Sequence, residues 1–331
     1  MSQYLDDLFI TIRKRHKFKK IVRKIFFPTY KLRGRKLYNK VVNYSDVVPL
    51  GKMDRNYRII VSLTTFPARF NSITLTLKSL LMQTVRPDKI VVWYYCDERG
   101  LTSEMREYEK YGVEYKKASE NIGPHKKYFD SLQIYNEDIV ICVDDDLVYP
   151  MDMIESLMNA YKVHPQCVCA RRVHKIKLKA NGEIDDYDKW IGECFFIHKP
   201  SHLLMATTGA GTLYPPNIFN ERMFDAEKIR ETCLYADDIW MKYLEIISNV
   251  KVVWVENDMP LPPTVEGSQI ANLYLDNLKN GRNNSYIKAM NEVYGEEIAQ
   301  ILKNDEDSYK KNVVLEWIQE LLGEQISCWR E

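Results

Sequence analysis

Three aspartates, Asp144, Asp145 and Asp146, directly follow the apolar run 139–143. Adjacent carboxylates repel one another and are costly to bury without a counter-charge. Mg²⁺ and Mn²⁺ prefer oxygen ligands, and Mg²⁺ takes one or two protein carboxylates while phosphate and water fill its other positions. If the strand continues, Asp144 and Asp146 point to the same side. The spacing therefore predicts a metal site on Asp144 and Asp146 for a nucleotide diphosphate, with a solvated acidic turn as the alternative.

A second acidic pair, Asp237 and Asp238, stands at the start of a predicted helix. Aspartate is among the best N-cap residues, so one of the two can simply cap the helix. A carboxylate whose pKa is raised by burial or by its neighbour can also act as a general base. The pair favours Asp238 as the base and leaves Asp237, or pure capping, as alternatives.

Strand and helix patterns alternate from Tyr57 onward and must position these acids. We expect strands over residues 58–63, 89–95, 113–117 and 138–143, and helices over 71–82, 101–111 and 125–135. Such alternation predicts an α/β fold, with a mostly parallel sheet flanked by helices. In open α/β sheets, ligands bind at the carboxyl ends of the strands, which is where Asp144 stands.

The second half of the chain has a less regular pattern. It predicts helices over residues 151–163 and 238–247, strands over 166–173 and 251–255, and a mobile proline-rich loop over 259–268. Two amphipathic helices are expected over 285–303 and 309–322. The expected domains are a basic segment 1–50, a catalytic domain 51–270 and a C-terminal helical extension 271–331.

The N-terminal segment is strongly basic. Between Thr11 and Lys40 there are thirteen Lys or Arg residues and no acid, although the whole chain has a net charge of only +1. The apolar residues Phe18, Ile21, Val22 and Ile25 share one helical face, and Pro28 should end that helix. A basic amphipathic helix can bind an anionic membrane surface, so we expect residues 11–40 to do so. A solvated or packed arm and a nucleic-acid contact are the alternatives.

The cysteines and the hydropathy pattern bear on location. The seven cysteines include no CxxC pair, which favours a reducing compartment. No apolar run is long enough to cross a membrane, and no signal-peptide pattern follows the first residues. We therefore expect a cytoplasmic protein, peripheral on the inner face of the cytoplasmic membrane.

Four motifs occur in an order that is similar to one family. Residues 61–69 (VSLTTFPAR) resemble the first strand and loop of GT-A nucleotide-sugar glycosyltransferases, and residues 144–146 resemble their DxD motif. Residues 208–216 (TGAGTLYPP) resemble their acceptor-side loop, and residues 236–240 (ADDIW) resemble the acidic motif of inverting members. The combination is similar to bacterial transferases that build capsule, O-antigen (lipopolysaccharide) or related surface polysaccharides. Ala236 departs from the Glu that many inverting members have before the catalytic Asp.

The resemblance implies roles for further residues. It places side chains of the first strand and loop at the nucleotide, Asp97 near the base or ribose, and a loop before the third helix at the diphosphate. The two glycines of the acceptor-side loop would let the backbone pass close to a sugar. The implied donor-site residues are Thr64, Thr65, Arg69, Asp97, Asn121, Gly123, Lys127, Asp144, Asp145, Gly209 and Gly211.

The resemblance also implies a reaction. It is a Mn²⁺- or Mg²⁺-dependent, inverting transfer of a hexose from a UDP-sugar to a saccharide or lipid-linked saccharide acceptor. Asp238 would take the acceptor proton and the metal would hold the donor diphosphate. A sugar-phosphate nucleotidyltransferase and a non-catalytic carbohydrate-binding protein on the same fold are the rival interpretations. The first would normally carry a glycine-rich basic loop after the first strand, where this chain has 64–67 (TTFP).

Overall fold

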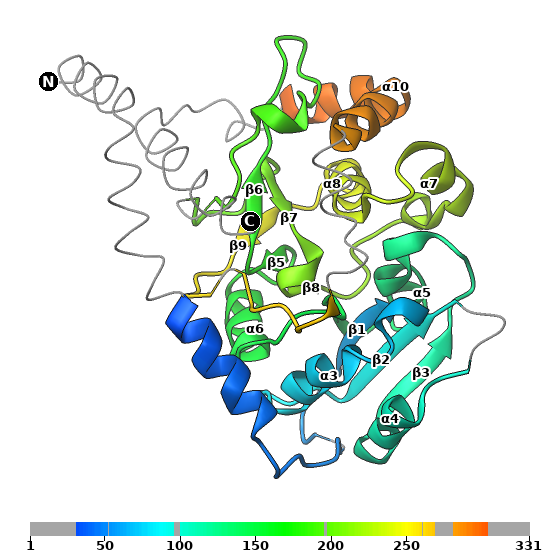
Figure 1. Cartoon of the computed structure of the whole chain (residues 1–331). Helices are drawn as coiled ribbons and strands as arrows, with labels where there is room; N and C mark the ends of the chain where they lie inside the picture. Colours follow the sequence, from blue (N-terminus) through cyan, green and yellow to red (C-terminus); the bar gives the residue numbers. More distant parts are fainter. Residues whose placement is uncertain are drawn as a thin grey trace, which may run out of the picture.

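The structure is a computed structural model that describes residues 31–51, 53–95, 100–194, 197–259, 261–268 and 281–303. Its centre is a seven-stranded sheet in the order β3-β2-β1-β4-β8-β5-β9 (Figure 1). The strands are β1 (Ile59–Thr65), β2 (Lys89–Tyr94), β3 (Val113–Lys117), β4 (Ile139–Cys142), β5 (Val168–Ala170), β8 (Thr212–Tyr214) and β9 (Val252–Trp254). β6 (Val173–Lys175) and β7 (Leu204–Ala206) form a separate antiparallel pair.

The strand order produces a switch point beside β1. β1 pairs in parallel with β2 on one side and with β4 on the other, and β2 pairs in parallel with β3. β8 runs antiparallel to both β4 and β5, and β5 pairs in parallel with β9. The predicted α/β class with a mostly parallel sheet is therefore confirmed. A crevice for ligands is expected where the chain leaves β1 and β4 in opposite directions.

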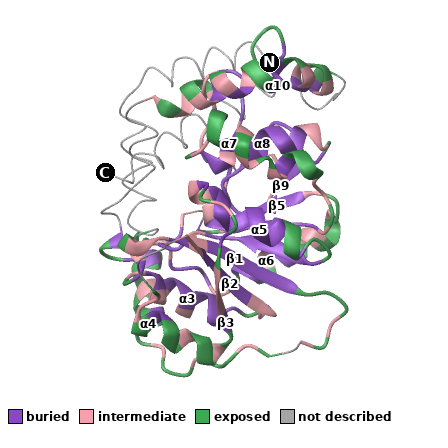
Figure 2. Ribbon diagram, turned by 90° about the vertical axis from the view of Figure 1, so that its right-hand side faces the viewer, coloured by how far each residue is buried: buried purple, intermediate pink, exposed green. Residues whose placement is uncertain are grey.

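Helices cover both faces of the sheet because residues along each strand alternate between them. Ile59, Val61 and Leu63 of β1 pack with α3 (Ile73–Leu81) and α6 (Met153–Val163). Ile60 faces the opposite core, which contains α5 (Lys126–Ile134) and α8 (Asp237–Ile247). Figure 2 shows the buried residues concentrated in the sheet between these layers. Other helices are α4 (Ser103–Arg106), α7 (Ala226–Thr232) and α10 (Arg282–Lys303).

The expected elements agree best in the first half of the sheet. The strand predicted over 113–117 is β3, and β1, β2 and β4 lie within two residues of their expected bounds. The helix predicted over 101–111 is instead α4 followed by the 3-10 helix η2 (Glu107–Tyr111). The strand predicted over 166–173 divides into β5 and β6, which belong to different sheets. The patterns did not predict β7, β8 or α7, which are too short to show a clear period.

The described part of the proline-rich loop expected over 259–268 pairs with the aspartate turn. The Val265 amide donates to the Asp146 carbonyl at 2.7 Å, and the Val148 amide donates to the Pro263 carbonyl at 2.8 Å. Leu147 and Thr264 form an antiparallel bridge. The segment 261–268 lies far from the triad in sequence, yet it holds the backbone at Asp146 and Val148.

A helix over residues 31–42 packs beside this segment. Its Val41 is fully buried in a small core with Val148 and Val265, and the Tyr38 hydroxyl accepts from the Glu266 amide at 3.3 Å. This part of the basic N-terminal segment is thus packed on the protein body. The predicted helical face of Phe18, Ile21, Val22 and Ile25, and the helix predicted over 309–322, lie outside the described residues. The helix predicted over 285–303 is α10.

No helix in the described ranges combines the length and apolar character needed to cross a membrane. The cysteines at 142, 167, 169, 194 and 233 form no disulfide bond with one another.

Candidate active site

The aspartate triad lies at the carboxyl end of β4, and its first contact is with a cation from the loop after β1. Arg69 ends the 3-10 helix η1 (Pro67–Arg69), and its Nη1 lies 2.6 Å from Asp145 Oδ1 and 3.0 Å from Asp146 Oδ2. We call these three residues the Arg69 cluster. Burial raises the pKa of the Asp145 carboxyl, and the Arg69 charge and the Thr65 hydroxyl oppose that rise. Burial lowers the pKa of Arg69, but Asp145 and Asp146 outweigh it and leave the pKa above its ordinary value.

Asp144 turns away from this cluster to a different cation. β4 ends at Cys142 and the chain turns at Asp145, so the alternation expected for a continuing strand does not apply. The Asp144 Oδ1 atom lies 2.7 Å from Lys127 Nζ, and 39% of the Asp144 side chain is exposed. The two predicted metal ligands, Asp144 and Asp146, therefore contact separate positive charges.

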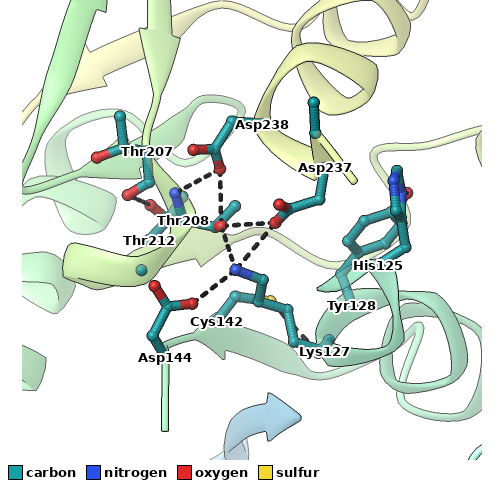
Figure 3. Close-up of polar contacts among 12 residues, drawn as sticks. His125, Lys127, Tyr128, Cys142, Asp144, Thr207, Thr208, Thr212, Asp237 and Asp238 are labelled. Carbon is teal, nitrogen blue, oxygen red and sulfur yellow. Dashed lines mark hydrogen bonds and ion pairs between the residues drawn. The ribbon is translucent and has the colours of Figure 1, made fainter. Parts of the chain in front are cut away.

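Lys127 joins Asp144 to the acidic pair at the start of α8. Its buried Nζ lies 2.9 Å from Asp237 Oδ2 and 2.8 Å from the Thr208 hydroxyl, in addition to Asp144 (Figure 3). The Thr208 hydroxyl lies 2.8 Å from Asp238 Oδ1, and the Thr208 amide donates to the same oxygen at 2.9 Å. We call Lys127, Asp144, Thr208, Asp237 and Asp238 the Lys127 cluster.

Topology explains why these residues meet. β8 runs antiparallel to β4, with Thr212 opposite Cys142, so the chain that leads into β8 passes the end of β4. That chain is the 3-10 helix η5 (Thr208–Ala210), and it lies beside Asp144. α5 presents Lys127 from below, and α8 presents its first residues from the other side (Figure 3).

Gly209 is required by a close approach. A Cβ atom on Gly209 would lie 1.9 Å from Asp144 Oδ2, so no other residue fits without moving the carboxylate. The Gly209 carbonyl accepts from the Tyr149 hydroxyl at 2.5 Å, and the same hydroxyl accepts from the Asp144 amide at 2.8 Å. Gly211 has a φ of +102°, a conformation that favours glycine. The two glycines of the predicted acceptor-side loop thus let the loop pass directly against the triad.

Neither member of the acidic pair is the N-cap residue of α8. The N-cap position is Ala236, which has no side chain that can cap, and the helix begins at Asp237. The interpretation of the pair as helix caps is therefore wrong. Both carboxylates instead contact the Thr208 hydroxyl, on a different element.

The two carboxyls have opposite pKa shifts. Burial raises the pKa of Asp237, but Lys127 and His125 outweigh it, so the pKa lies below its ordinary value. Burial, and then the neighbouring Asp237 charge, raise the pKa of Asp238 to about 7. A carboxyl whose pKa is near neutral can hold or release a proton at physiological pH, which suits a general base. The pair therefore separates into a charged, ion-paired acid and a titratable one.

The structure does not bring every predicted site residue into these clusters. Thr64 donates its hydroxyl to the Trp93 carbonyl at 3.0 Å within the sheet, whereas the buried Thr65 hydroxyl lies near enough to influence Asp145. Gly123 packs against the backbone, where a Cβ would lie 2.9 Å from the Leu234 carbonyl oxygen. Asn121 is exposed, and no described contact links it to either cluster. Asp97 lies outside the described residues.

Two residues in the site were not among the predicted ones. Thr208 belongs to the motif over residues 208–216, but its side chain was assigned no role there. A threonine directly before a glycine turn is well placed to form hydrogen bonds through its hydroxyl. Tyr149 carried no local signal, because its contacts with Asp144 and Gly209 arise only from the folding of the chain.

The donor set at the triad suits an open cation site. No group of three or more His, Cys, Asp or Glu side chains within the described ranges is arranged to enclose a metal ion. Two carboxylates, one of them partly exposed, match the donor number that Mg²⁺ takes when phosphate and water complete its shell. The residues present therefore fit a divalent cation that shares its ligands with a diphosphate.

Comparison with known proteins agrees with this geometry. Residues 63–212 match the family model described as Glycosyl transferase family 2, a range that runs from β1 to β8 and includes the triad and Thr208. A search of curated proteins finds no significant match to the chain. The family match covers less than half of the chain, and together with the mostly parallel sheet it supports a glycosyltransferase on a GT-A fold.

A search of solved structures finds matches that include a mannosyltransferase, PcManGT from Pyrobaculum calidifontis in complex with GDP-Man and Mn²⁺. That structure has a TM-score of 0.43 and 12% sequence identity, over 95% of this chain and 92% of that one. S. aureus TarS 1-349 has a TM-score of 0.37 and 17% identity, over 60% of this chain and 59% of that one. A 4-diphosphocytidyl-2C-methyl-D-erythritol synthase has a TM-score of 0.40 and 10% identity, over 68% and 99%.

Proposed function

We propose that this glycosyltransferase is metal-dependent and inverting, and that it transfers a hexose from a UDP-sugar to a saccharide or lipid-linked saccharide acceptor in surface polysaccharide synthesis. One observation carries the proposal. Asp238, with a pKa of about 7, lies beside the same short loop that contacts Asp144 of the acidic triad. A single displacement at a sugar carbon requires a base close to the site that holds the diphosphate, and this loop brings the two together.

Donor binding is assigned to the triad and its surroundings. Asp144 and Asp146 would hold Mn²⁺ or Mg²⁺, and Arg69 offers a guanidinium that suits phosphate or ribose oxygens. The bound cation would neutralise charge that develops on the leaving diphosphate. Thr64, Thr65, Asn121, Gly123 and Asp97 stay predicted donor-site residues. Lys127 is buried within its own cluster, so we assign it to organising the carboxylates and not to direct phosphate contact.

Asp238 is assigned as the base that takes the proton from the acceptor hydroxyl. Its Oδ1 atom accepts from Thr208, and no described group bonds to its Oδ2 atom. Asp237 already pairs with Lys127, which lowers its pKa and makes it the poorer base. One base without a carboxylate nucleophile supports inversion, by analogy with the geometry of glycoside hydrolases.

The basic N-terminal segment is assigned to an anionic membrane surface on the cytoplasmic side. In the described part of that segment, Lys31, Arg35, Lys36 and Lys40 are exposed while Val41 faces the body. Each basic residue near an anionic surface contributes about 1 kcal/mol. Sedimentation with anionic vesicles tests this assignment, and equal binding by the full chain and a chain that lacks residues 1–45 would contradict it.

A donor screen tests the function directly. Calorimetry with UDP-, GDP- and other nucleotide-linked hexoses, in Mn²⁺ or Mg²⁺, should give binding that EDTA abolishes and that Asp146→Ala weakens strongly. Asp152→Ala is a matched control, because its exposed carboxylate lies outside both clusters. Metal-independent binding would contradict the cation site. Product with a retained anomeric configuration, measured by NMR, would contradict inversion alone.

A further inference from the structure

We propose that Thr208 is a positioning residue that holds the Asp238 carboxylate and fixes it relative to Asp144. This inference rests on the proposed role of Asp238 as the base. Thr208 and Gly209 are consecutive, and they contact the two carboxylates that the reaction would use. The Thr208 amide and hydroxyl contact Asp238, while the Gly209 Cα faces Asp144 Oδ2.

The amide of Thr208 is available because of where it stands in the chain. Thr208 is the first residue of η5, and the first amides of a helix have no partner within it. An amide that is buried must find another acceptor, and Asp238 Oδ1 provides it at 2.9 Å. Asp238 therefore satisfies the first amide of this loop, and the same hydrogen bond holds the Asp238 carboxylate.

The neighbours of the Thr208 hydroxyl decide which carboxylate receives its proton. The hydroxyl has a single proton, and it accepts from Lys127 Nζ at 2.8 Å. It can donate either to Asp238 Oδ1 at 2.8 Å or to Asp237 Oδ2 at 3.0 Å. Asp237 Oδ2 already has the Lys127 ammonium at 2.9 Å. The proton therefore goes to Asp238, and a chain of donors runs from Lys127 through Thr208 to the base.

This arrangement leaves one oxygen of the base for the acceptor. Both Thr208 donors converge on Oδ1, and Figure 3 shows the second oxygen of Asp238 directed away from Thr208. A carboxylate held at one oxygen cannot rotate freely, so the other oxygen keeps a fixed direction. Fixing a catalytic group in this way accounts for a large share of rate enhancement in enzymes.

Several other groups influence the same carboxyl. Lys127 from α5 and Asp237 from α8 are the charged ones, and Cys142 of β4, Tyr214 of β8 and Cys233 before α8 are buried, neutral groups nearby. Thr208 differs from all of them because it donates hydrogen bonds directly to the Asp238 carboxylate. Removal of its hydroxyl should therefore change Asp238 without changing the net charge of the site.

The test compares three threonine variants. Thr208→Val keeps the branched shape and removes the hydroxyl, and Thr208→Ser keeps the hydroxyl. Thr207→Val is the matched control, because the neighbouring Thr207 hydroxyl is directed to the Arg172 carbonyl at 3.3 Å and not to Asp238. The first measurement is the Asp238 pKa by carboxyl ¹³C NMR, assigned with Asp238→Asn, which needs neither donor nor acceptor.

We expect Thr208→Val to raise the Asp238 pKa by about one unit, since a hydrogen bond to the ionised form is lost. Thr208→Ser and Thr207→Val should keep the wild-type value. An unchanged pKa in Thr208→Val, or equal shifts in Thr208→Val and Thr208→Ser, would overturn the proposal. The second outcome would show that the loss of the hydroxyl is not the specific cause of the pKa shift.

The second measurement is the kinetics of transfer with the donor found by the screen. Thr208→Val should lower kcat about tenfold to a hundredfold and leave the donor Kd in Mn²⁺ unchanged, and Thr208→Ser should recover most of the loss. A loss confined to donor affinity would overturn the positioning role. If the wild-type chain transfers no sugar from any donor, the proposed function fails, while the NMR comparison still decides whether Thr208 holds Asp238.

Discussion

The Arg69 cluster and the Lys127 cluster divide one aspartate triad between them, yet their cations make different kinds of contact. Arg69 contacts two adjacent residues, Asp145 and Asp146, which belong to a single turn. Lys127 contacts Asp144 at the end of β4 and Asp237 on α8, which are far apart in sequence. The first cation stabilises a local turn, and the second connects the triad to the acidic pair of α8. One positive charge thus shapes the site locally, and the other couples its two halves.

The largest expected effect is the loss of the base. Asp238→Asn keeps the shape of the side chain and should lower kcat by about 10²–10⁴-fold, because general acid–base catalysis contributes that much. Asp237→Asn should cost less, because Asp237 is engaged with Lys127. Steady-state kinetics of both variants separates the two acids. Full activity in both would remove the base assignment and, with it, the distinction between the clusters.

Removal of each cation should destabilise the fold and distinguish the two clusters. Arg69→Met leaves Asp145 buried without its partner, and Lys127→Met does the same to Asp237. Breaking a buried ion pair in this way costs about 3–5 kcal/mol of unfolding free energy. Urea unfolding at neutral pH measures both losses.

Only Lys127→Met should also raise the Asp238 pKa, because Lys127 lies near Asp238 and its charge lowers that pKa. Lys126→Met is the control, since the Lys126 ammonium donates to the Gly123 carbonyl and to neither cluster. Equal effects of Arg69→Met and Lys127→Met on Asp238 would show that the two clusters form one unit.

The loop at Gly209, which passes Asp144, should tolerate few substitutions. Gly209→Ala places a Cβ where Asp144 Oδ2 now lies, so the carboxylate must move. A displacement of about 1 Å in a catalytic site can cost ~100-fold in rate, and we expect a loss of that order in kcat/KM. Gly192→Ala is a suitable control, because a Cβ there meets nothing within 4 Å. Normal metal and donor binding by Gly209→Ala would argue against a role for Asp144.

The pH dependence should be the most gradual effect. The base acts in its ionised form, and burial together with Asp237 raises the pKa of Asp238 to about 7. We therefore expect kcat to fall about tenfold per pH unit below pH 7 and to level off above it. Asp237→Asn removes the neighbouring negative charge, so the acidic limb should move to lower pH. A limb that stays in place would show that burial alone sets the Asp238 pKa.

The raised pKa of Asp238 also affects the stability of the fold, which should decrease over the pH range where activity increases. Because the folded state binds the Asp238 proton more tightly than the unfolded state does, Asp238 makes the fold less stable as pH rises from about 4 to about 7. Asp238→Asn should therefore stabilise the protein above pH 7 and lose this advantage in acid. Thermal unfolding across that pH range measures it.

Sequence and structure agree most closely in the parallel half of the sheet. β1, β2, β3 and β4 are continuous apolar or alternating runs between clear turn signals, so their patterns were enough to place them. β8 has three residues between two loops, and its pairing with β4 depends on contacts over seventy residues away in the chain. Local patterns contain no information about such a partner. The partners of β8 and of the loop that precedes it were therefore less predictable than the positions of β1 to β4.

The sequence by itself determined which chemical groups are present: a triad of carboxylates after an apolar strand, an acidic pair before a helix, and glycines that permit a close backbone approach. These follow from residue type and spacing, because charge repulsion and backbone sterics act over a few residues. Only the tertiary structure decided the pairing of charges. It divided the triad between Arg69 and Lys127, gave Asp237 an ion pair, and placed Asp238 against Thr208. Those partners come from separate elements, and the resulting pKa values depend on burial and distance, which exist only once the sheet has formed.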